Sequence, residues 1–146
     1  MTSRSATCIV VGASSGIGLA IARRLGHQGR KVALLARREG ELMAQVALIN
    51  EALGRELASG YVHDAADVDA AEGLFAKIEA DLGAVDEVHF VAGVMPEVGP
   101  DECDLDKDRQ QVNVNMLGCI ACTQSGSWVF ARAGLRLIAH MNATSE

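Results

Sequence analysis

The feature that most constrains the fold is a glycine-rich turn near the amino terminus, with glycines at positions 12, 16 and 18. The preceding residues 6–11 are apolar and rich in β-branched side chains, which predicts a buried strand. Residues 17–28 carry apolar side chains at helical spacing. Such glycines allow a tight exit from the strand, close approach of the backbone to a phosphate, and close packing of helix on strand. Because a helix start also favours anions, we expect a dinucleotide pyrophosphate here.

The rest of the chain alternates between the same two patterns. Further strands are predicted at residues 31–36, 60–63, 87–91 and 135–141, and further helices at residues 39–53, 68–82 and 105–133. Both prolines lie in residues 95–102, which predicts a loop. This alternation is typical of parallel sheets with right-handed crossovers. We expect an α/β fold: a doubly wound parallel sheet of about five strands in the order 3-2-1-4-5, with helices on both faces and a ligand crevice between strands 1 and 4.

Composition narrows the class of protein and its partners. With 146 residues the chain suits one domain, and 49% hydrophobic but only 3% aromatic residues indicate an aliphatic core. A formal net charge of −6 argues against nucleic acid or an anionic membrane as a partner. No apolar run reaches the roughly 20 residues of a membrane span, and the amino terminus lacks a signal-peptide pattern. We expect a cytoplasmic protein.

Four cysteines do not predict a disulfide scaffold in a chain of this length. Cys119 and Cys122 form a C-x-x-C pair, but inside an apolar helical stretch rather than at a helix start that would lower a thiol pKa. A zinc site would need two further ligands nearby, and the sequence offers none at suitable spacing. We expect both thiols to pack as small apolar groups, and no metal site.

The turn has the spacing Gly-x-x-x-Gly-x-Gly, and residues 10–25 as a whole resemble the opening of the short-chain dehydrogenase/reductase family. Further matches follow in the family's order over residues 5–118: two arginines after the second strand, Asp64 after the third, Ala92-Gly93 after the fourth, and Asn115-Met-Leu-Gly118 in the next helix. The resemblance implies a Rossmann-like fold and an oxidoreductase. Such an enzyme transfers a hydride between a nicotinamide dinucleotide and a carbonyl or secondary alcohol.

By position, the resemblance also implies which residues contact the cofactor. Those that would line the phosphates and ribose are Gly12, Ser14, Ser15, Gly16, Ile17 and Gly18. Asp64 would contact the adenine, and Ala92 and Gly93 would pass beneath the nicotinamide side. Asn115 matches a helix asparagine that supports a water in the family's proton relay, with Asn113 as a neighbouring alternative.

The end of the second strand distinguishes two cofactors. An acidic residue there would bond the ribose 2′-hydroxyl and repel a 2′-phosphate. This chain has Ala36, followed by Arg37 and Arg38. A guanidinium matches a phosphate with two charge-assisted hydrogen bonds. We therefore expect NADP(H) rather than NAD(H), with both arginines as cofactor contacts.

The family's catalytic residues lack clear counterparts. The family uses a tyrosine, a lysine four residues later that lowers its pKa, and a serine that orients the substrate oxygen. The one tyrosine, Tyr61, lies in a predicted strand with Ala65 four residues on, and Ser145 matches the serine only with a shift in register. Where the family commonly has Asn-Asn-Ala-Gly, this chain reads Phe90-Val-Ala-Gly93.

We therefore expect one NAD(P)-binding domain over residues 1–146, incomplete at its carboxyl end relative to the family and not catalytic alone. The alternatives are a non-catalytic NADP(H)-binding module and a fragment that self-associates through the apolar helix at residues 116–131. An unpaired edge beside the fifth strand and an exposed apolar helix favour a homo-oligomer. The substrate, a carbonyl or alcohol if the chain is active, is not specified by these residues.

Overall fold

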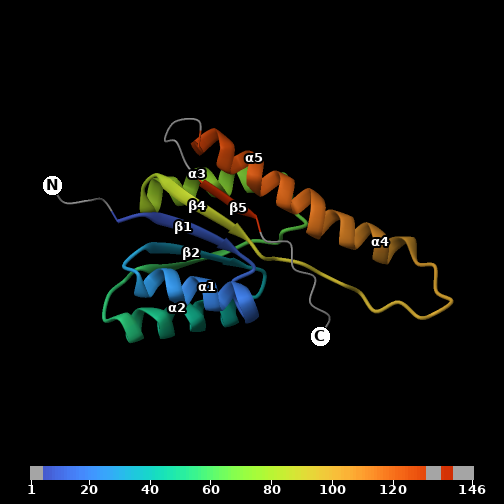
Figure 1. The fold of residues 1–146 in the computed structure, drawn as a ribbon, viewed down its shortest axis with the longest axis horizontal. Coiled ribbons are helices and arrows are strands. Elements are labelled where there is room, and N and C mark those ends of the chain that lie inside the picture. The colour runs from blue at the N-terminus through green and yellow to red at the C-terminus, as the bar shows by residue number, and fades with distance from the viewer. Residues whose placement is uncertain (1–4, 131–135, 140–146) are drawn as a thin grey trace.

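The computed structural model describes the backbone of residues 5–130 and 136–139 and the side chains of residues 5–126. Five parallel strands form one sheet in the order β3-β2-β1-β4-β5, which confirms the predicted doubly wound fold (Figure 1). The strands are β1 (Thr7–Val11), β2 (Lys31–Ala36), β3 (Ala58–Val62), β4 (Val85–Phe90) and β5 (Arg136–Ala139).

Helices cover both faces of this sheet (Figure 1). One face carries α1 (Gly16–His27) and α2 (Glu39–Leu53). The other carries α3 (Ala71–Leu82) and a long helix that consists of α4 (Leu105–Gln111), the π-helical segment η1 (Val112–Gly118) and α5 (Cys119–Phe130). The long helix corresponds to the one predicted over residues 105–133, of which residues 131–133 lie outside the described part.

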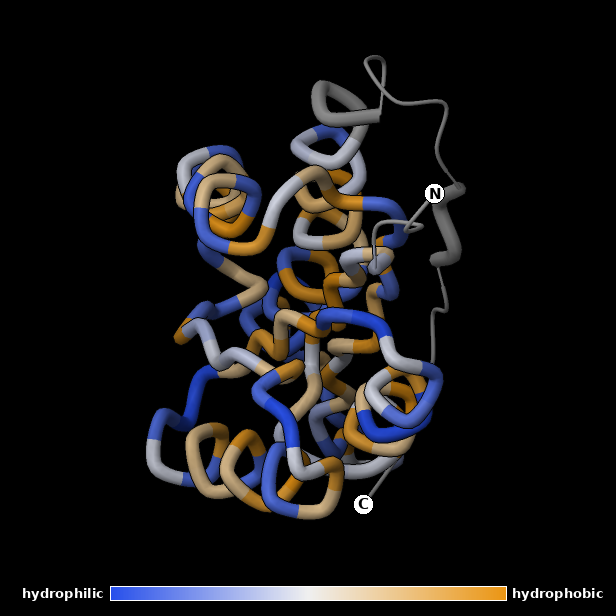
Figure 2. Tube along the Cα trace, turned by 90° about the vertical axis from the view of Figure 1, so that its left-hand side faces the viewer, coloured by the Kyte–Doolittle hydropathy of each residue, from blue (hydrophilic) through white to orange (hydrophobic). Residues whose placement is uncertain are grey.

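The strand β1 shows how the sequence produces the two-sided core. Successive side chains of a strand point to opposite faces, so a strand covered by helices on both sides must be apolar throughout. Ile9 and Val11 pack toward α3 and the long helix, whereas Cys8 and Val10 pack toward α1 and α2. The helices themselves alternate between hydrophobic and hydrophilic residues, as expected for elements buried on one side (Figure 2).

The strand β3 begins two residues earlier than predicted, at Ala58 instead of residue 60. Gly60 therefore lies inside the strand, paired with Leu34, rather than at its start. A Cβ at Gly60 would come within 3.0 Å of the Met43 sulfur on α2. The glycine that reads as a strand boundary thus marks a close approach of helix and sheet.

The strand β4 also begins two residues early, at Val85 instead of residue 87. The first three residues of β4 include Asp86 and Glu87, whose charged side chains interrupt the apolar pattern expected of a buried strand. Both carboxylates have partners: Thr7 N donates to Asp86 Oδ2 at 2.7 Å, and Arg30 Nη1 lies 2.7 Å from Glu87 Oε1. The strand tolerates these acidic residues because each carboxylate has a hydrogen-bonding or charged partner outside β4.

Candidate functional site

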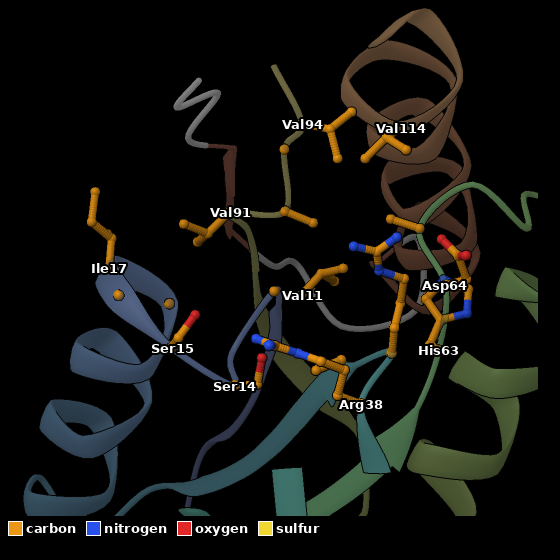
Figure 3. A pocket seen from close by; sticks show the side chains of 18 residues that line it. Val11, Ser14, Ser15, Ile17, Arg38, His63, Asp64, Val91, Val94 and Val114 are labelled. Carbon is orange, nitrogen blue, oxygen red and sulfur yellow. The ribbon is translucent and has the colours of Figure 1, made fainter. Parts of the chain in front are cut away.

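A pocket of about 440 Å³ opens where the carboxyl ends of the parallel strands meet the helix starts (Figure 3). Eleven of its lining residues are those predicted from the sequence as cofactor contacts: Gly12, Ser14, Ser15, Gly16, Ile17, Gly18, Arg37, Arg38, Asp64, Ala92 and Gly93. The sequence reasoning missed seven more, most of them apolar: Val11, Ala36, His63, Ala65, Val91, Val94 and Val114. These had no motif to mark them, because small apolar residues at strand ends are common throughout the chain.

Backbone hydrogen bonds determine the shape of the pocket floor. The carbonyl oxygen of Leu35, near the end of β2, accepts from the N–H of Gly12 at 2.8 Å. The carbonyl oxygen of Val11, the last residue of β1, accepts from the N–H groups of Val91 and Ala92, both at 2.9 Å. The glycine-rich turn and the segment after β4 are therefore attached to neighbouring strands without any side chain.

The three glycines of the turn have different roles. Gly12 has a φ of +87°, and a Cβ there would come within 2.7 Å of the Ala92 backbone. A Cβ at Gly18 would overlap the carbonyl oxygen of Gly12, so this glycine lets α1 pack on the turn. Gly16 has a φ of +55°, but a Cβ there would meet no heavy atom within 4 Å. Its open surroundings leave room for a ligand to approach the backbone.

The start of α1 offers hydrogen-bond donors to an anion. Ser15 precedes the helix with an extended φ of −156°, and its side chain makes no capping hydrogen bond. The first turn of α1 contains no acidic residue. At α4, by contrast, the Asp104 side chain accepts from two backbone N–H groups. Within the described part of the chain, α1 therefore keeps its first N–H groups and the Ser15 hydroxyl for an external partner.

Arg37 and Arg38 follow the last residue of β2 and differ in their partners. Arg38 Nη1 lies 2.8 Å from Glu41 Oε1, in the first turn of α2. Arg37 forms no ion pair and no side-chain hydrogen bond with any residue that the structure describes. In Figure 3 the Arg38 side chain extends toward Ser14 of the turn, and Asp64 lies on the opposite wall.

His63 and Asp64 form the wall beyond β3 (Figure 3). The His63 side chain is buried, and this burial lowers the pKa of its imidazole, against the opposing influence of Asp67 and Asp64. One carboxylate oxygen of Asp64 accepts from the N–H of Ala66 at 3.0 Å. The wall thus presents a neutral imidazole ring beside the Asp64 carboxylate, which a hydrogen bond within its own turn holds in place.

Asn115 lies behind the pocket wall instead of lining it. Its Nδ2 donates to the carbonyl oxygen of Val94 and its Oδ1 accepts from the Val94 N–H, both at 2.8 Å. Asn113, the alternative, is exposed. Both polar groups of the Asn115 amide therefore hold the segment after β4, and the water-supporting role implied by the family stays a prediction.

Gly118 brings the same helix against the opposite wall. A Cβ at Gly118 would overlap the carbonyl oxygen of Ala65, which lines the pocket next to Asp64. Asn115 thus connects η1 to the segment after β4, and Gly118 lets η1 pack closely on the segment after β3. π-helical segments are frequent at functional sites because the extra residue redirects the side chains that follow.

The side chains of residues 5–126, which the structure describes, do not assemble a catalytic set. Ser145 lies outside the described residues. The Tyr61 hydroxyl donates to Asp81 Oδ2 at 3.1 Å, and burial together with Asp81 raises the Tyr61 pKa to about 12. Tyr61 is not among the lining residues of the pocket, as expected for a strand residue.

The C-x-x-C pair also has the predicted environment. Cys122 is buried in the core cluster beneath the long helix, and this burial raises its pKa to about 12. Cys119 packs partly buried against the same cluster. Within residues 5–126, no group of three or more His, Cys, Asp or Glu side chains is placed to hold a metal ion. No described helix is long and apolar enough to cross a membrane.

Comparison with known proteins gives close matches in sequence. A short chain dehydrogenase of Pseudocercospora fijiensis is 38% identical over 94 residues, which are 64% of this chain and 29% of that protein. The 3beta-hydroxysteroid dehydrogenase of Mediterraneibacter gnavus is 32% identical over 115 residues, which are 78% of this chain and 41% of that protein. The chain thus spans less than half the length of these relatives.

Solved structures and the family profile agree with these matches. Actinorhodin polyketide ketoreductase with NADPH has a TM-score of 0.86 at 31% identity, over 95% of this chain and 54% of that one. Alcohol dehydrogenase from the archaeon Thermococcus sibiricus, complexed with 5-hydroxy-NADP, has a TM-score of 0.85 at 26% identity, over 92% of this chain and 57% of that one. The profile of the short chain dehydrogenases matches residues 6–134. The chain therefore belongs to the short-chain dehydrogenase family.

Proposed function

We propose that this chain is the NADP(H)-binding part of an oxidoreductase that acts on a carbonyl or a secondary alcohol. One observation carries the proposal: a single pocket combines the open backbone at Gly16, Arg37 without a partner among the described residues, and the turn after β4. Two similar structures contain NADPH and 5-hydroxy-NADP, respectively. When bound, a nicotinamide group would donate or accept a hydride at the substrate carbon.

Each wall of the pocket would bind a different part of the dinucleotide. The first N–H groups of α1, with Ser15 and Gly16, would hold the pyrophosphate. Arg37 would bind the 2′-phosphate with its guanidinium fork. Asp64 and the apolar surface beside it would contact the adenine. Ala92 and Gly93 would support the nicotinamide side, where the Asn115 amide fixes the adjacent backbone.

The cofactor assignment is tested by titrating the chain with NADPH and NADH and following nicotinamide fluorescence. Charge-assisted hydrogen bonds contribute roughly 1.5–3 kcal/mol, so we expect Arg37→Ala to weaken NADPH binding about 10- to 150-fold. NADH binding should change less than about twofold, because it lacks the 2′-phosphate. Arg23→Ala is the matched control, since Arg23 is exposed on α1 and donates to Gln45. Equal losses for both cofactors would contradict the assignment.

A second candidate is an NADP(H)-binding module without turnover. The observation that favours it is the engagement of the one tyrosine with Asp81, away from the pocket wall. We expect the 146-residue chain to bind NADPH without oxidising it in the presence of aldehydes or ketones, measured by nicotinamide absorbance. A Tyr-x-x-x-Lys motif encoded after residue 146 would favour the oxidoreductase. Coding sequence without that motif would favour the binding module.

We also propose that residues 1–146 form one domain and that two copies associate through the long helix. Val112, Met116 and Ile120 stand four residues apart, with exposed fractions of 48%, 54% and 45%. Leu105 and Leu117 are exposed on the same helix, at 60% and 42%. Apolar stripes of this kind are typical of association surfaces. Light scattering should show a dimer or larger species that Met116→Glu converts to a monomer, and a monodisperse monomer before mutation would contradict association.

A further inference from the structure

The two arginines after β2 are not equivalent, and the difference lies in a residue outside the pocket. Arg38 is paired with Glu41 at 2.8 Å, whereas Arg37 has no described partner. Glu41 is not among the residues that line the pocket. Its ion pair with Arg38 connects it to the site.

We infer that Glu41 determines how strongly this pocket prefers a 2′-phosphorylated dinucleotide, because it holds Arg38 in competition with the phosphate. The inference rests on the proposed cofactor site and adds a specificity-determining residue to it. Arg37 is then the principal ligand of the 2′-phosphate. Arg38 is a second cation whose availability depends on Glu41.

The competition follows from elementary electrostatics. A guanidinium can bind one planar anion bidentately, so a carboxylate and a phosphate compete for the same fork. The Glu41 carboxylate is also a negative charge close to the expected place of the phosphate, which adds repulsion. Glu41 lies in the first turn of α2, three residues after Arg38. A ribose 2′-hydroxyl carries no charge, so an unphosphorylated dinucleotide should not enter the competition.

The expected size of the effect follows from the exposure of the pair. The Arg38 and Glu41 side chains are 63% and 50% exposed. Exposed ion pairs of this kind correspond to about a 1.5- to fivefold change in an equilibrium constant. Glu41 should therefore adjust the preference for the phosphorylated cofactor, while Arg37 creates it.

The experiment compares Glu41→Gln with the unmodified chain in calorimetric titrations with NADPH, NADH and 2′,5′-ADP. We expect the variant to bind NADPH and 2′,5′-ADP about 1.5- to fivefold more tightly and NADH equally well. Glu39→Gln is the matched control, because Glu39 lies in the same first turn and makes no ion pair with a described residue. In an Arg38→Ala background, Glu41→Gln should give a smaller gain, because only the direct repulsion of the phosphate is then removed. Higher salt should reduce the gain in the single variant.

The outcomes separate this inference from the proposed function. If the unmodified chain binds neither NADPH nor NADH, both are overturned. If it binds NADPH but Glu41→Gln leaves the NADPH-to-NADH ratio unchanged or lowers it, only the role of Glu41 is overturned. The same holds if Glu39→Gln gives an equal gain, since the effect would then come from total charge. Circular dichroism of each variant verifies that the fold is retained.

Discussion

The Asn115 side chain and the Val94 backbone form a reciprocal pair of hydrogen bonds, each 2.8 Å long. Asn115 belongs to the π-helical segment, and Val94 follows β4 on the pocket wall. A side-chain amide thus replaces the backbone partner that Val94 would have in a continuing strand. The segment after β4 can therefore leave the sheet with the N–H and the carbonyl group of Val94 both paired.

Replacing Asn115 should therefore destabilise the fold. Two partly buried hydrogen bonds contribute about 1–3 kcal/mol together, so we expect Asn115→Ala to lower the free energy of unfolding by that amount. Asn115→Asp should also be destabilising, because a carboxylate cannot donate to the Val94 carbonyl oxygen. Denaturant unfolding measures both. The exposed Asn113 gives the control: Asn113→Ala should change stability by less than about 0.5 kcal/mol, and equal effects at the two positions would contradict the role of Asn115.

Gly16 and Gly12 should respond differently to alanine. At Gly16 the new Cβ meets no protein atom, so the cost is that of a left-handed residue, about 1–2 kcal/mol. NADPH binding should nevertheless weaken at least about tenfold, because the methyl group would enter the space proposed for the pyrophosphate. At Gly12 the Cβ would also contact the Ala92 backbone, so we expect a loss of about 2–5 kcal/mol. Unfolding and NADPH titrations of both variants test this, and unchanged NADPH affinity in Gly16→Ala would argue against a phosphate at that turn.

Gly118 and Gly73 form a second pair of glycines on helices. Gly118→Ala should lower the free energy of unfolding by about 1–3 kcal/mol, because its Cβ would overlap the Ala65 carbonyl oxygen. Gly73→Ala on α3 should instead raise stability by about 0.5–1 kcal/mol, since nothing lies within 4 Å of its Cβ. Thermal unfolding of the two variants should give shifts of opposite sign. A stabilising Gly118→Ala would show that η1 does not need its close contact with the β3 exit.

Burial of His63 predicts a dependence of stability on pH. Its pKa is lowered in the folded state, mainly by burial, from an ordinary value of 6.5. The unfolded chain therefore binds the proton more readily, and the contribution of His63 to stability is complete above pH 6.5. It is lost as the pH falls from there through the lower folded-state pKa.

The free energy of unfolding, measured from about pH 8 to about pH 5, tests this dependence. His63→Gln should flatten the decline in stability toward acid. His27, exposed at the end of α1, provides the control, and His27→Gln should keep the decline. A decline of the same steepness in His63→Gln would assign the effect to other groups.

The strand order could be predicted because each strand next to the glycine turn is covered on both faces. The apolar residues 6–11 leave little choice except a central strand, and the helical repeats between strands require crossovers. The pocket wall could be predicted because parallel strands bring their carboxyl ends to one edge. Arg37 and Asp64, remote in sequence, line the same pocket for that reason.

Other features leave no pattern in the sequence. The π-helical segment adds one residue to a turn, and seven residues with mixed apolar positions look the same in either geometry. Asn115 binds a backbone, and backbone groups are identical at every residue. The Arg38–Glu41 pair did have a signal, since two opposite charges stand three residues apart at the start of a predicted helix.

The carbonyl oxygens of Leu35 and Val11 also have a consequence for divergence within the family. Main-chain hydrogen bonds attach the glycine turn to β2 and the segment after β4 to β1, so these attachments do not depend on which side chains follow β2. The residues that would select the cofactor lie apart from this framework, after β2. One or two substitutions at positions 37 to 41 could therefore change the preferred dinucleotide during evolution, while the main-chain framework of the pocket stays the same.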